Sequence, residues 1–559
     1  MPSEQDRALA ENLIQRVNVG DSLTRSAAAH PGRTAVCDGD RRWTYERFNA
    51  LVNRVAGGLA GLGYARGDAL AIASGNSAEF LALYYAAAKL GVVCVPINLG
   101  WRPDEVAYVL GHSRSRGIAV EQRLLGAMAE AIGKVPEVAD ILVIPSAEAA
   151  TGSTTGAEPP TEPPTEAPAE PPTEAPAELA DRRWSSFDAL VERGTEAEPA
   201  HHVEDRDPLT YLYTSGTTSF PKGVVASHLA IYLESMSSAL ECGWSRADRF
   251  AAMMPMFHTA QLNAFCTPAV LIGAAIHVLR GFEPEVLLDA VERERLTQVF
   301  GLPMMYRAML EHPSFAGRDL SSLRRCTYAM AAMPEALIRR CLDEFGCDFA
   351  LLFGQTEMSP VTTLFRPEHQ LSHLGAVGTP VTNVQVGIMG PDGALLLTGE
   401  VGEIVYRGPS TMTGYLRNPE ATGEAFAHGW FHSGDVGRFD GDGVLWFADR
   451  FKDVIKTGGE NVASIEVELA VYAADDGIAE AVVVGLPHPR WSEAITAVVL
   501  VKPGRTLDPA ALLTALKGRL DGYKVPKSVI VADELPRTST GKVQKNVIRQ
   551  RYGDYYDPS

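Results

Sequence analysis

The sequence lacks the cysteine patterns of disulfide-linked and zinc-binding proteins. Seven cysteines occur among 559 residues, an odd number with no Cys-x-x-Cys spacing. A disulfide framework needs paired cysteines, and a structural zinc site needs closely spaced thiol or imidazole ligands. We therefore expect neither feature, and a reducing cytoplasm is the expected location.

Long apolar runs and clustered positive charge are missing as well. The most apolar stretch, Ala264 to Val278, is shorter than a membrane span and contains Pro268 and His277, so we expect a buried helix or strand there. The N-terminus mixes acidic and basic residues without an apolar core, unlike a signal peptide. The chain has 50 Lys and Arg against 69 Asp and Glu, a net charge of −19. This balance disfavours binding to nucleic acid, which depends on clustered cations.

Alternating strand and helix patterns fill much of the chain. Leu70 to Ala73 is typical of a short buried strand, Ser77 can cap a following helix, and Gly91 can end that helix before the next strand. The same order returns at 287–300 and at 326–353. Repeated β-α-β units imply an α/β fold in which helices cover parallel sheets.

The composition changes at two places. Glu158 to Glu178 is a Pro/Glu/Thr/Ala repeat with six Glu and no basic residue, which predicts a disordered surface insertion at about 150–180. Near Ala448 a predicted strand pair ends, and a compact segment with a Lys-rich end begins. We therefore predict an N-terminal domain at 1–449 and a C-terminal domain at 450–559.

A phosphate-binding loop is predicted directly after an apolar strand. The segment is Tyr211-Leu-Tyr-Thr-Ser-Gly-Thr-Thr-Ser-Phe-Pro-Lys-Gly-Val. Small residues let backbone N–H groups approach an anion, hydroxyl groups add donors, and Lys222 supplies a positive charge. The loop is not a Walker motif, because Pro221 occupies the position of the second glycine and Gly223 follows the lysine.

This segment resembles the phosphate loop of the adenylate-forming superfamily, which includes acyl-CoA synthetases, adenylation domains and luciferases. Four further motifs match that superfamily in the same order: Phe353-Gly-Gln-Thr-Glu, Gly429-Trp-Phe-His-Ser-Gly-Asp, Asp449-Arg-Phe-Lys-Asp-Val-Ile-Lys-Thr-Gly-Gly-Glu-Asn and Pro536-Arg-Thr-Ser-Thr-Gly-Lys. The resemblance implies a large N-terminal domain of parallel β-α-β sheets with a small barrel-like subdomain, and a small, mobile α+β C-terminal domain. It also implies that the protein uses ATP, Mg²⁺, CoA and a small carboxylic acid.

The resemblance assigns a nucleotide site. The residues implied to hold ATP or AMP are Thr214, Ser215, Gly216, Thr217, Thr218, Lys222, Phe353, Gly354, Gln355, Thr356, Glu357, Asp435, Arg450 and Lys542. Phe353 stands where the family usually has a tyrosine packed on adenine, and it keeps the stacking surface. Glu357 and Thr217 would ligate Mg²⁺, a hard cation that prefers oxygen. Asp435 would accept hydrogen bonds from the ribose hydroxyl groups, with Arg450 nearby.

Two lysines and one histidine are the implied catalytic residues. In the family, the lysine at the position of Lys542 enters the site and bridges the carboxylate and the α-phosphate, where its charge stabilises the transition state. Lys222 would hold phosphate oxygens. His258, in a Pro-x-Phe-His segment, would border the acyl site. A hydrogen-bonded, buried histidine with no catalytic role is the competing interpretation.

A second half-reaction would need a thiol nucleophile. Lys452 matches the family's hinge residue, whose backbone rotates between the two half-reactions. The residues implied to contact CoA are Lys456, Gly458, Gly459 and Asn461. Bare glycines allow an extended ligand to approach closely. The pattern favours CoA as acceptor, and the phosphopantetheine of a carrier protein remains the alternative.

The segments expected to bind the acid, 253–263 and 328–334, carry no charged residue that could pair with a substrate amine. Met330 stands where a small residue is usual, and this long, adaptable side chain can reshape the cavity. We therefore expect a medium- or long-chain fatty acid. Aryl acids of the coumarate or benzoate type and carnitine- or crotonobetaine-like acids remain open.

One hypothesis comes from a different class of protein, a catalytically silent nucleotide-binding protein. Its support is Ser219, which replaces the usual glycine of the phosphate loop, together with Met330. Each charge that the chemistry needs is present, which opposes this hypothesis; the charged residues are Lys222, Glu357, Asp435 and Lys542.

Overall fold

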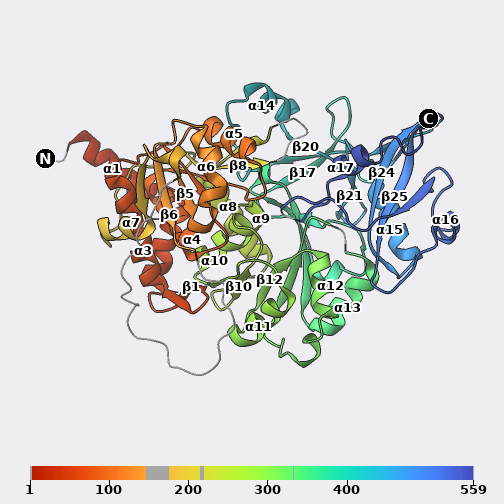
Figure 1. Cartoon of the computed structure of the whole chain (residues 1–559), viewed down its shortest axis with the longest axis horizontal. Helices are drawn as coiled ribbons and strands as arrows, with labels where there is room; N and C mark the ends of the chain where they lie inside the picture. The colour runs from red at the N-terminus through yellow and green to blue at the C-terminus, as the bar shows by residue number, and fades with distance from the viewer. Residues whose placement is uncertain (1–2, 147–175, 215–219, 332, 540, 558–559) are drawn as a thin grey trace.

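The structure is a computed structural model that describes residues 3–146, 176–214, 220–331, 333–539 and 541–557 (Figure 1). The insertion expected at about 150–180 lies mostly outside the described residues, as do 215–219 of the predicted phosphate loop. The chain forms an α/β fold with a large N-terminal domain and a smaller C-terminal domain, which is blue in Figure 1.

The first predicted β-α-β unit is confirmed. Strand β3 (Ala69–Ala73) is followed by helix α4 (Ala78–Leu90) and strand β4 (Val93–Pro96). The Ser77 hydroxyl accepts a hydrogen bond from the Phe80 backbone N–H at 2.9 Å. Gly91 ends the helix in a left-handed conformation with φ of 70°. These are the local interactions by which such residues begin and end helices.

The first large sheet has eight strands and carries the predicted phosphate loop. Its strand order is β19-β9-β8-β4-β3-β5-β6-β7, parallel except where β9 pairs with β8 and with β19. Besides β3 and β4, its strands are β5 (Ser115–Glu121), β6 (Asp140–Ile144), β7 (Arg183–Ser186), β8 (Pro208–Thr214), β9 (Lys222–Ser227) and β19 (Gly414–Tyr415). The predicted loop therefore begins at the carboxyl end of β8.

The second large sheet has nine strands in the order β16-β15-β14-β13-β12-β10-β11-β1-β2. Its middle six strands run parallel, and β2, β15 and β16 are antiparallel to their neighbours. The strands are β1 (Thr34–Asp38), β2 (Arg41–Thr44), β10 (Arg249–Ala252), β11 (Ala275–Val278), β12 (Gln298–Gly301), β13 (Arg325–Tyr328), β14 (Asp348–Gly354), β15 (Val361–Phe365) and β16 (Thr379–Pro380).

The small subdomain is a four-stranded antiparallel sheet in the order β17-β18-β20-β21. Its strands are β17 (Gln385–Met389), β18 (Gly402–Arg407), β20 (Phe431–Phe439) and β21 (Leu445–Arg450). The register of β20 and β21 places Asp435 directly opposite Arg450. Two residues assigned to the nucleotide site are therefore brought together by strand pairing.

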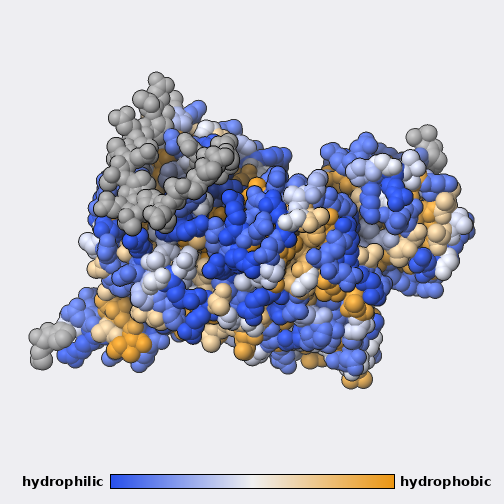
Figure 2. Space-filling model, turned by 90° about the horizontal axis from the view of Figure 1, so that it is seen from below, coloured by the Kyte–Doolittle hydropathy of each residue, from blue (hydrophilic) through white to orange (hydrophobic). Residues whose placement is uncertain are grey.

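The C-terminal domain is built on its own sheet, in which β23, β22, β25 and β24 pair antiparallel and β26 pairs parallel with β25. Its strands are β22 (Ile455–Thr457), β23 (Glu460–Val462), β24 (Ile478–His488), β25 (Ser492–Val501) and β26 (Ser528–Val531). Its helices are α15 (Ser464–Ala474), α16 (Pro509–Lys517) and α17 (Lys545–Arg551). Figure 2 shows this domain as the smaller lobe on the right, set off from the larger lobe by a notch.

Helices cover the two large sheets. They are α1 (Glu4–Gln15), α2 (Val19–Ala29), α3 (Tyr45–Gly61), α5 (Pro103–Ser113), α6 (Leu125–Gly133), α7 (Phe187–Arg193), α8 (His228–Glu241), α9 (Thr259–Gln261), α10 (Thr267–Ile272), α11 (Pro284–Glu294), α12 (Pro303–Glu311), α13 (Glu335–Phe345) and α14 (Pro419–Ala425). The stretch Ala264 to Val278 is buried, and it contains both a helix, α10, and a strand, β11. None of the helices in the described ranges combines the length and hydropathy of a membrane span.

Helix α4 is buried along its whole length and packs against α2 and α3. Its last charged side chain, Lys89, is only 1% exposed. The Lys89 ammonium donates hydrogen bonds to side-chain oxygens of Asn49, Asn53 and Glu198, each at 2.7 Å. All three donors of the ammonium group are thereby satisfied in the core.

We expect Lys89→Ala to destabilise the N-terminal domain by about 3 kcal/mol, the lower end of the cost of breaking a buried charge network, because Glu198 keeps some access to water. The measurement is chemical denaturation followed by circular dichroism. Lys134→Ala is the matched control, since its ion pairs with Asp104 and Glu130 lie on the surface and should leave the transition unchanged. Equal midpoints for the two variants would contradict this prediction.

Candidate active site

A cavity of about 1040 Å³ lies where the two large sheets, the small sheet and the C-terminal domain meet. The sequence-predicted residues that line it are Thr214, Lys222, His258, Phe353, Gly354, Gln355, Thr356, Glu357, Asp435, Arg450, Lys452 and Lys542. They come from the carboxyl ends of β8 and β14, the start of β9, the N-cap of α9, the β20–β21 pair, the connection after β21 and the C-terminal domain. Ser215, Gly216, Thr217 and Thr218 lie outside the described residues.

The four residues assigned to CoA do not line this cavity. Lys456, Gly458, Gly459 and Asn461 lie on the β22–β23 hairpin of the C-terminal domain and are exposed. The Gly458 backbone N–H donates to the Trp491 carbonyl at 2.9 Å, which ties the hairpin to the start of β25. In this arrangement the hairpin therefore takes no part in the cavity.

The aromatic face expected for adenine lies at the end of β14. The Phe353 ring contacts the Phe447 ring, with centroids 5.3 Å apart. Gly354 follows, and a Cβ atom there would lie 1.9 Å from the Pro360 carbonyl oxygen. The Gln355 backbone N–H donates to that same oxygen at 2.9 Å. Only glycine fits at position 354, and the resulting turn holds Phe353 and Gln355 at the cavity wall.

Two buried polar atoms at the cavity make no hydrogen bond within the described part of the chain, although one of them, Asp435 Oδ1, lies in an ion pair with Arg450. They are Gln355 Nε2, a donor, and Asp435 Oδ1, an acceptor. Buried polar atoms are almost always hydrogen-bonded, so an orphan donor and an orphan acceptor on one cavity wall indicate a ligand-binding surface. A nucleoside offers both the acceptors and the hydroxyl donors that these atoms require.

Burial raises the pKa of Asp435 to about 6, although Arg450 and Lys542 both favour the ionised form. The Arg450 Nε atom lies 3.3 Å from Asp435 Oδ1. A carboxylate in this position can accept two hydroxyl groups at once. This geometry agrees with the ribose-binding role that the sequence resemblance implies.

Glu357 and Lys222 meet through a residue that the sequence analysis missed. The Tyr415 hydroxyl donates to Glu357 Oε1 at 3.0 Å, and the Lys222 ammonium lies 4.9 Å from the centre of the Tyr415 ring. Burial raises the pKa of Glu357, so a nearby cation would favour its ionised form. The Glu357 carboxylate fits the oxygen preference of Mg²⁺. Thr217, the other predicted ligand, lies outside the described residues.

Lys542 enters the cavity from the C-terminal domain. Although water in the cavity reaches the side chain, its enclosure and the charge of Arg450 lower the pKa of Lys542 to about 8. Asp435 acts in the opposite direction and favours the charged amine. The ammonium therefore lies within electrostatic range of the Asp435 carboxylate, where it can stabilise negative charge on a ligand.

His258 is held in one orientation by the helix that it begins. Its Nδ1 atom accepts the Ala260 backbone N–H at 3.2 Å, as the N-cap of α9. Because Nδ1 is the acceptor, the proton of the neutral ring is on Nε2, which is left as a donor. Enclosure and the charge of Lys542 lower the pKa of His258 to about 4, so the ring is neutral at physiological pH. The histidine is thus both a structural cap and a cavity residue.

The part of the cavity beyond His258 is apolar. Its walls come from the turn after α9 and from the ends of β12, β13 and β14, and they include Ala264, Phe265, Phe300, Met330, Met333, Leu351 and Leu352. The Phe265 and Phe300 rings stack with centroids 4.6 Å apart. A buried polar pair also lines the cavity, in which the Tyr328 hydroxyl donates to Gln370 Oε1 at 2.8 Å. Sequence reasoning missed Gln370, because no local motif surrounds it.

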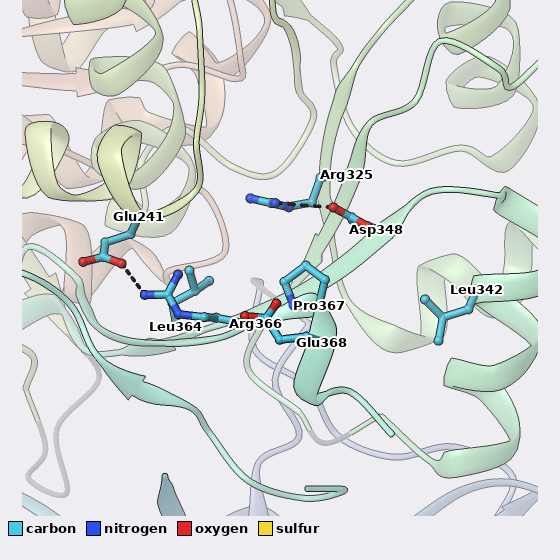
Figure 3. Close-up of a pocket in the computed structure, with 8 residues that line it drawn as sticks. All are labelled: Glu241, Arg325, Leu342, Asp348, Leu364, Arg366, Pro367 and Glu368. Carbon is cyan, nitrogen blue, oxygen red and sulfur yellow. Dashed lines mark hydrogen bonds and ion pairs between the residues drawn. The ribbon is translucent and has the colours of Figure 1, made fainter. Parts of the chain in front are cut away.

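Other candidate sites carry charges that are already paired. A second cavity, of about 480 Å³, lies among Arg325, Asp348, Glu241 and Arg366, which form two ion pairs in Figure 3. No sequence-predicted site residue lines it.

One group of metal-ligand side chains, Cys37, His277 and Glu294, occurs among the described residues. The Arg42 guanidinium donates to Glu294 at 2.7 Å. Burial, together with the charges of Arg42 and Arg249, lowers the pKa of His277 to about 4. The Arg42 guanidinium therefore already neutralises Glu294, the carboxylate of this group.

Comparison with known proteins decides the family. A model of the AMP-binding enzyme family matches residues 23–416, and a model of the AMP-binding enzyme C-terminal domain matches residues 466–542. The chain belongs to the AMP-binding enzyme family.

Several members of this family resemble the chain over almost its whole length. Feruloyl-CoA synthase from Amycolatopsis sp is 35% identical, over 97% of this chain and 100% of that protein. A long-chain-fatty-acid–CoA ligase from Mycobacterium tuberculosis is 34% identical, over 96% and 98%. The structure of an anthranilate CoA ligase with anthranoyl-AMP has a TM-score of 0.84 at 25% identity, covering 97% of this chain and 98% of that one. The chain is therefore an AMP-forming acid–CoA ligase of the acyl-CoA synthetase type.

Lys542→Met should slow acyl-adenylate formation by about 100-fold, the usual cost of removing one preorganised charge from a transition state. The methionine retains most of the apolar stem, so the fold is preserved. The measurement is pyrophosphate release in the presence of ATP and a carboxylic acid. Lys517→Met, at the exposed end of α16, is the matched control and should leave the rate unchanged. Comparable rates for the wild type and Lys542→Met would contradict the role given to Lys542.

The pH dependence follows from two groups in the free enzyme. Asp435 must be ionised to accept the ribose hydroxyl groups, and Lys542 must be charged. Since their pKa values are about 6 and about 8, kcat/KM for ATP should rise as pH increases through the first and fall as it increases through the second. Lys542→Arg should remove the upper limb, because a guanidinium stays charged. An upper limb that persists in this variant would contradict the assignment.

Proposed function

We propose that the protein activates an apolar carboxylic acid in two steps. In the first, the carboxylate attacks the α-phosphate of ATP, which gives an acyl-adenylate and releases pyrophosphate. In the second, the CoA thiol attacks the acyl carbon, which gives the thioester and releases AMP. The observation that carries the proposal is that Lys542, from the C-terminal domain, shares one cavity with Asp435 and His258 of the N-terminal domain.

For the first step, the phosphates would be held by Thr214, Thr356 and Lys222, which line the same cavity. The Lys542 ammonium would bridge the carboxylate and the α-phosphate and stabilise the charge that builds up on phosphorus. The Nε2–H group of His258 would donate to the acid. Each of these roles is positional and electrostatic, so no side chain has to accept a proton.

A divalent cation completes this part of the proposal. Glu357 would hold Mg²⁺, with Thr217 as a further ligand, and the ion would offset phosphate charge when bound. The raised pKa of Glu357 supports the assignment, because a buried carboxyl without a cation is favoured in its neutral form.

For the second step, we propose that the C-terminal domain turns about Lys452, in the chain that joins β21 and β22. The position of Lys452 between the last strand of the small sheet and the first strand of the C-terminal sheet supports such a motion. The turn would bring Lys456, Gly458, Gly459 and Asn461 to the cavity. A Cβ atom at Gly459 would meet nothing within 4 Å, which leaves room for the extended pantetheine chain.

The acid that we propose is a fatty acid of medium chain length. The walls of the acid side are uncharged and rich in flexible aliphatic groups, among them Met330, Met333 and Leu352. The cavity of about 1040 Å³ has to hold ATP as well, which favours medium chains over long ones. A long-chain-fatty-acid–CoA ligase among the relatives supports a fatty acid as substrate, whereas the choice of chain length rests on the cavity volume.

An aryl acid is the second candidate, and a specific observation favours it. The stacked Phe265 and Phe300 rings offer a flat face, and the Tyr328–Gln370 pair offers polar atoms for a ring substituent. The names of two relatives, feruloyl-CoA synthase and anthranilate CoA ligase, support this alternative.

A panel of acids separates the two candidates. With ATP, Mg²⁺ and CoA, we expect octanoate or decanoate to give thioester with a kcat/KM at least about tenfold above that of ferulate, the discrimination that a few methylene groups provide. Products are identified by mass spectrometry, and Lys542→Met reports the background. The reverse order would assign the aryl acid. Acyl-adenylate without thioester would call for a phosphopantetheinylated carrier protein in place of CoA, and no product from any acid would contradict the proposed reaction.

A further inference from the structure

The loop that carries Lys542 contacts the N-terminal domain at a tight turn after β4, residues 98–101, which we name the Asn98 turn. The Gly100 backbone N–H donates to Asn98 Oδ1 at 2.9 Å, and the Trp101 backbone N–H donates to the Asn98 carbonyl at 3.1 Å. These two bonds fix the side-chain carbonyl of Asn98 at the wall of the active-site cavity. A carbonyl oxygen has two lone pairs, so Oδ1 can accept a second hydrogen bond.

That second bond comes from the C-terminal domain. The Ser539 hydroxyl donates to Asn98 Oδ1 at 2.6 Å, across 441 residues of sequence. Ser539 lies three residues before Lys542 on the same loop. Asn98 Oδ1 thus accepts two hydrogen bonds, one from within the Asn98 turn and one from the loop that carries Lys542.

Gly100 is in direct contact with Ser539. A Cβ atom at Gly100 would lie 2.7 Å from Ser539 Cβ and 3.3 Å from Ser539 Oγ. The φ angle of Gly100 is not in the left-handed region, so alanine could adopt this backbone without strain. Glycine at position 100 is therefore required by the close approach of Ser539 and not by its own conformation.

The described residues of this loop are bonded to one another on both sides of Ser539, so a shift of Ser539 would be passed on to Lys542. Arg537 and Val543 pair as a β-bridge, and the Thr538 N–H donates to the Lys542 carbonyl at 2.8 Å. The Lys542 N–H donates to the Thr538 hydroxyl at 3.1 Å. Arg537 also forms an ion pair with Glu480, which fastens the loop to β24.

We propose that the Asn98 turn is the positioning site that seats Lys542 for acyl-adenylate formation, with Asn98 as the acceptor for Ser539 and Gly100 as the surface that Ser539 must approach. The inference rests on the proposed two-step reaction and deepens it. Lys542 is needed in the cavity for the first step, whereas the second step places a different face of the C-terminal domain there. The contact should therefore control the first half-reaction and leave the second one free.

Gly100→Ala is the direct test. The added methyl group should slow acyl-adenylate formation at least about tenfold, the rate equivalent of a moderate overpacking cost. This step is measured in a single turnover, as pyrophosphate release without CoA. The second step is measured by adding CoA and chemically prepared acyl-adenylate, and its rate should stay within about twofold of the wild type, because no transition-state interaction is removed. The retained second step also shows that the variant is folded.

A rescue experiment separates positioning from general damage. Ser539→Gly removes the two atoms that lie closest to the new methyl group and leaves Asn98 Oδ1 at 3.4 Å, an ordinary contact. By itself it should slow the first step about threefold to tenfold through the lost hydrogen bond. The double variant, Gly100→Ala with Ser539→Gly, should then be as fast as Ser539→Gly alone. Gly126→Ala is the matched control, since a Cβ atom at this exposed position on α6 would meet nothing within 4 Å.

Each possible result either supports or contradicts the positioning role of the Asn98 turn. Equal slowing of both half-reactions by Gly100→Ala, or a double variant slower than Ser539→Gly, would overturn the positioning role while leaving the proposed reaction intact. An unchanged first step in Gly100→Ala would do the same. A wild type that forms neither acyl-adenylate nor thioester would overturn the proposed function itself, and the inference with it.

Discussion

The active site depends on holding the Lys542 ammonium in an enclosed space that already contains positive charge. Enclosure is the main cause that lowers the pKa of Lys542, the charges of Arg450 and Lys452 add to it, and Asp435 favours the charged amine. An ammonium group that is partly shielded from water is stabilised strongly by an anionic ligand, because the ligand replaces the solvation that water would otherwise provide. The chain as a whole is acidic, so the cations that line this cavity, among them Lys222, Arg450 and Lys542, favour an anionic ligand such as the phosphates of ATP.

The fold brings the ends of several strands together around the Lys542 ammonium. The carboxyl ends of β8 and β14 supply Thr214 and the segment from Phe353 to Glu357, and the β20–β21 pair supplies Asp435 and Arg450. Ligands of α/β proteins bind beyond the carboxyl ends of parallel strands, where loops can be shaped without disturbing the sheet. The amine then arrives on a separate domain, so the cavity is complete only when the two domains meet in the present arrangement.

Different structural features hold the residues proposed for the nucleotide and the residues proposed for the acid. The groups proposed for the nucleotide follow strand ends and are held by backbone turns, such as the one at Gly354. The groups proposed for the acid are side chains of the cavity wall, such as the buried, stacked Phe265 and Phe300 rings and the more exposed Met330. The shape of the acid side can change with a few side chains while the turns stay the same. Relatives with equal overlap can therefore carry names as different as feruloyl-CoA synthase and long-chain-fatty-acid–CoA ligase.

The sequence by itself determined the α/β class, the limits of α4, the family and the residues expected at the nucleotide. These depend on interactions between close neighbours, such as the Ser77 cap and the turn that Gly354 permits, and short segments carry that information. Only the tertiary structure decided which distant residues meet: Tyr415 with Glu357, Tyr328 with Gln370, and Asn98 with Ser539. No local pattern encodes those contacts, because they form only after sheets and domains from separate parts of the chain have packed together.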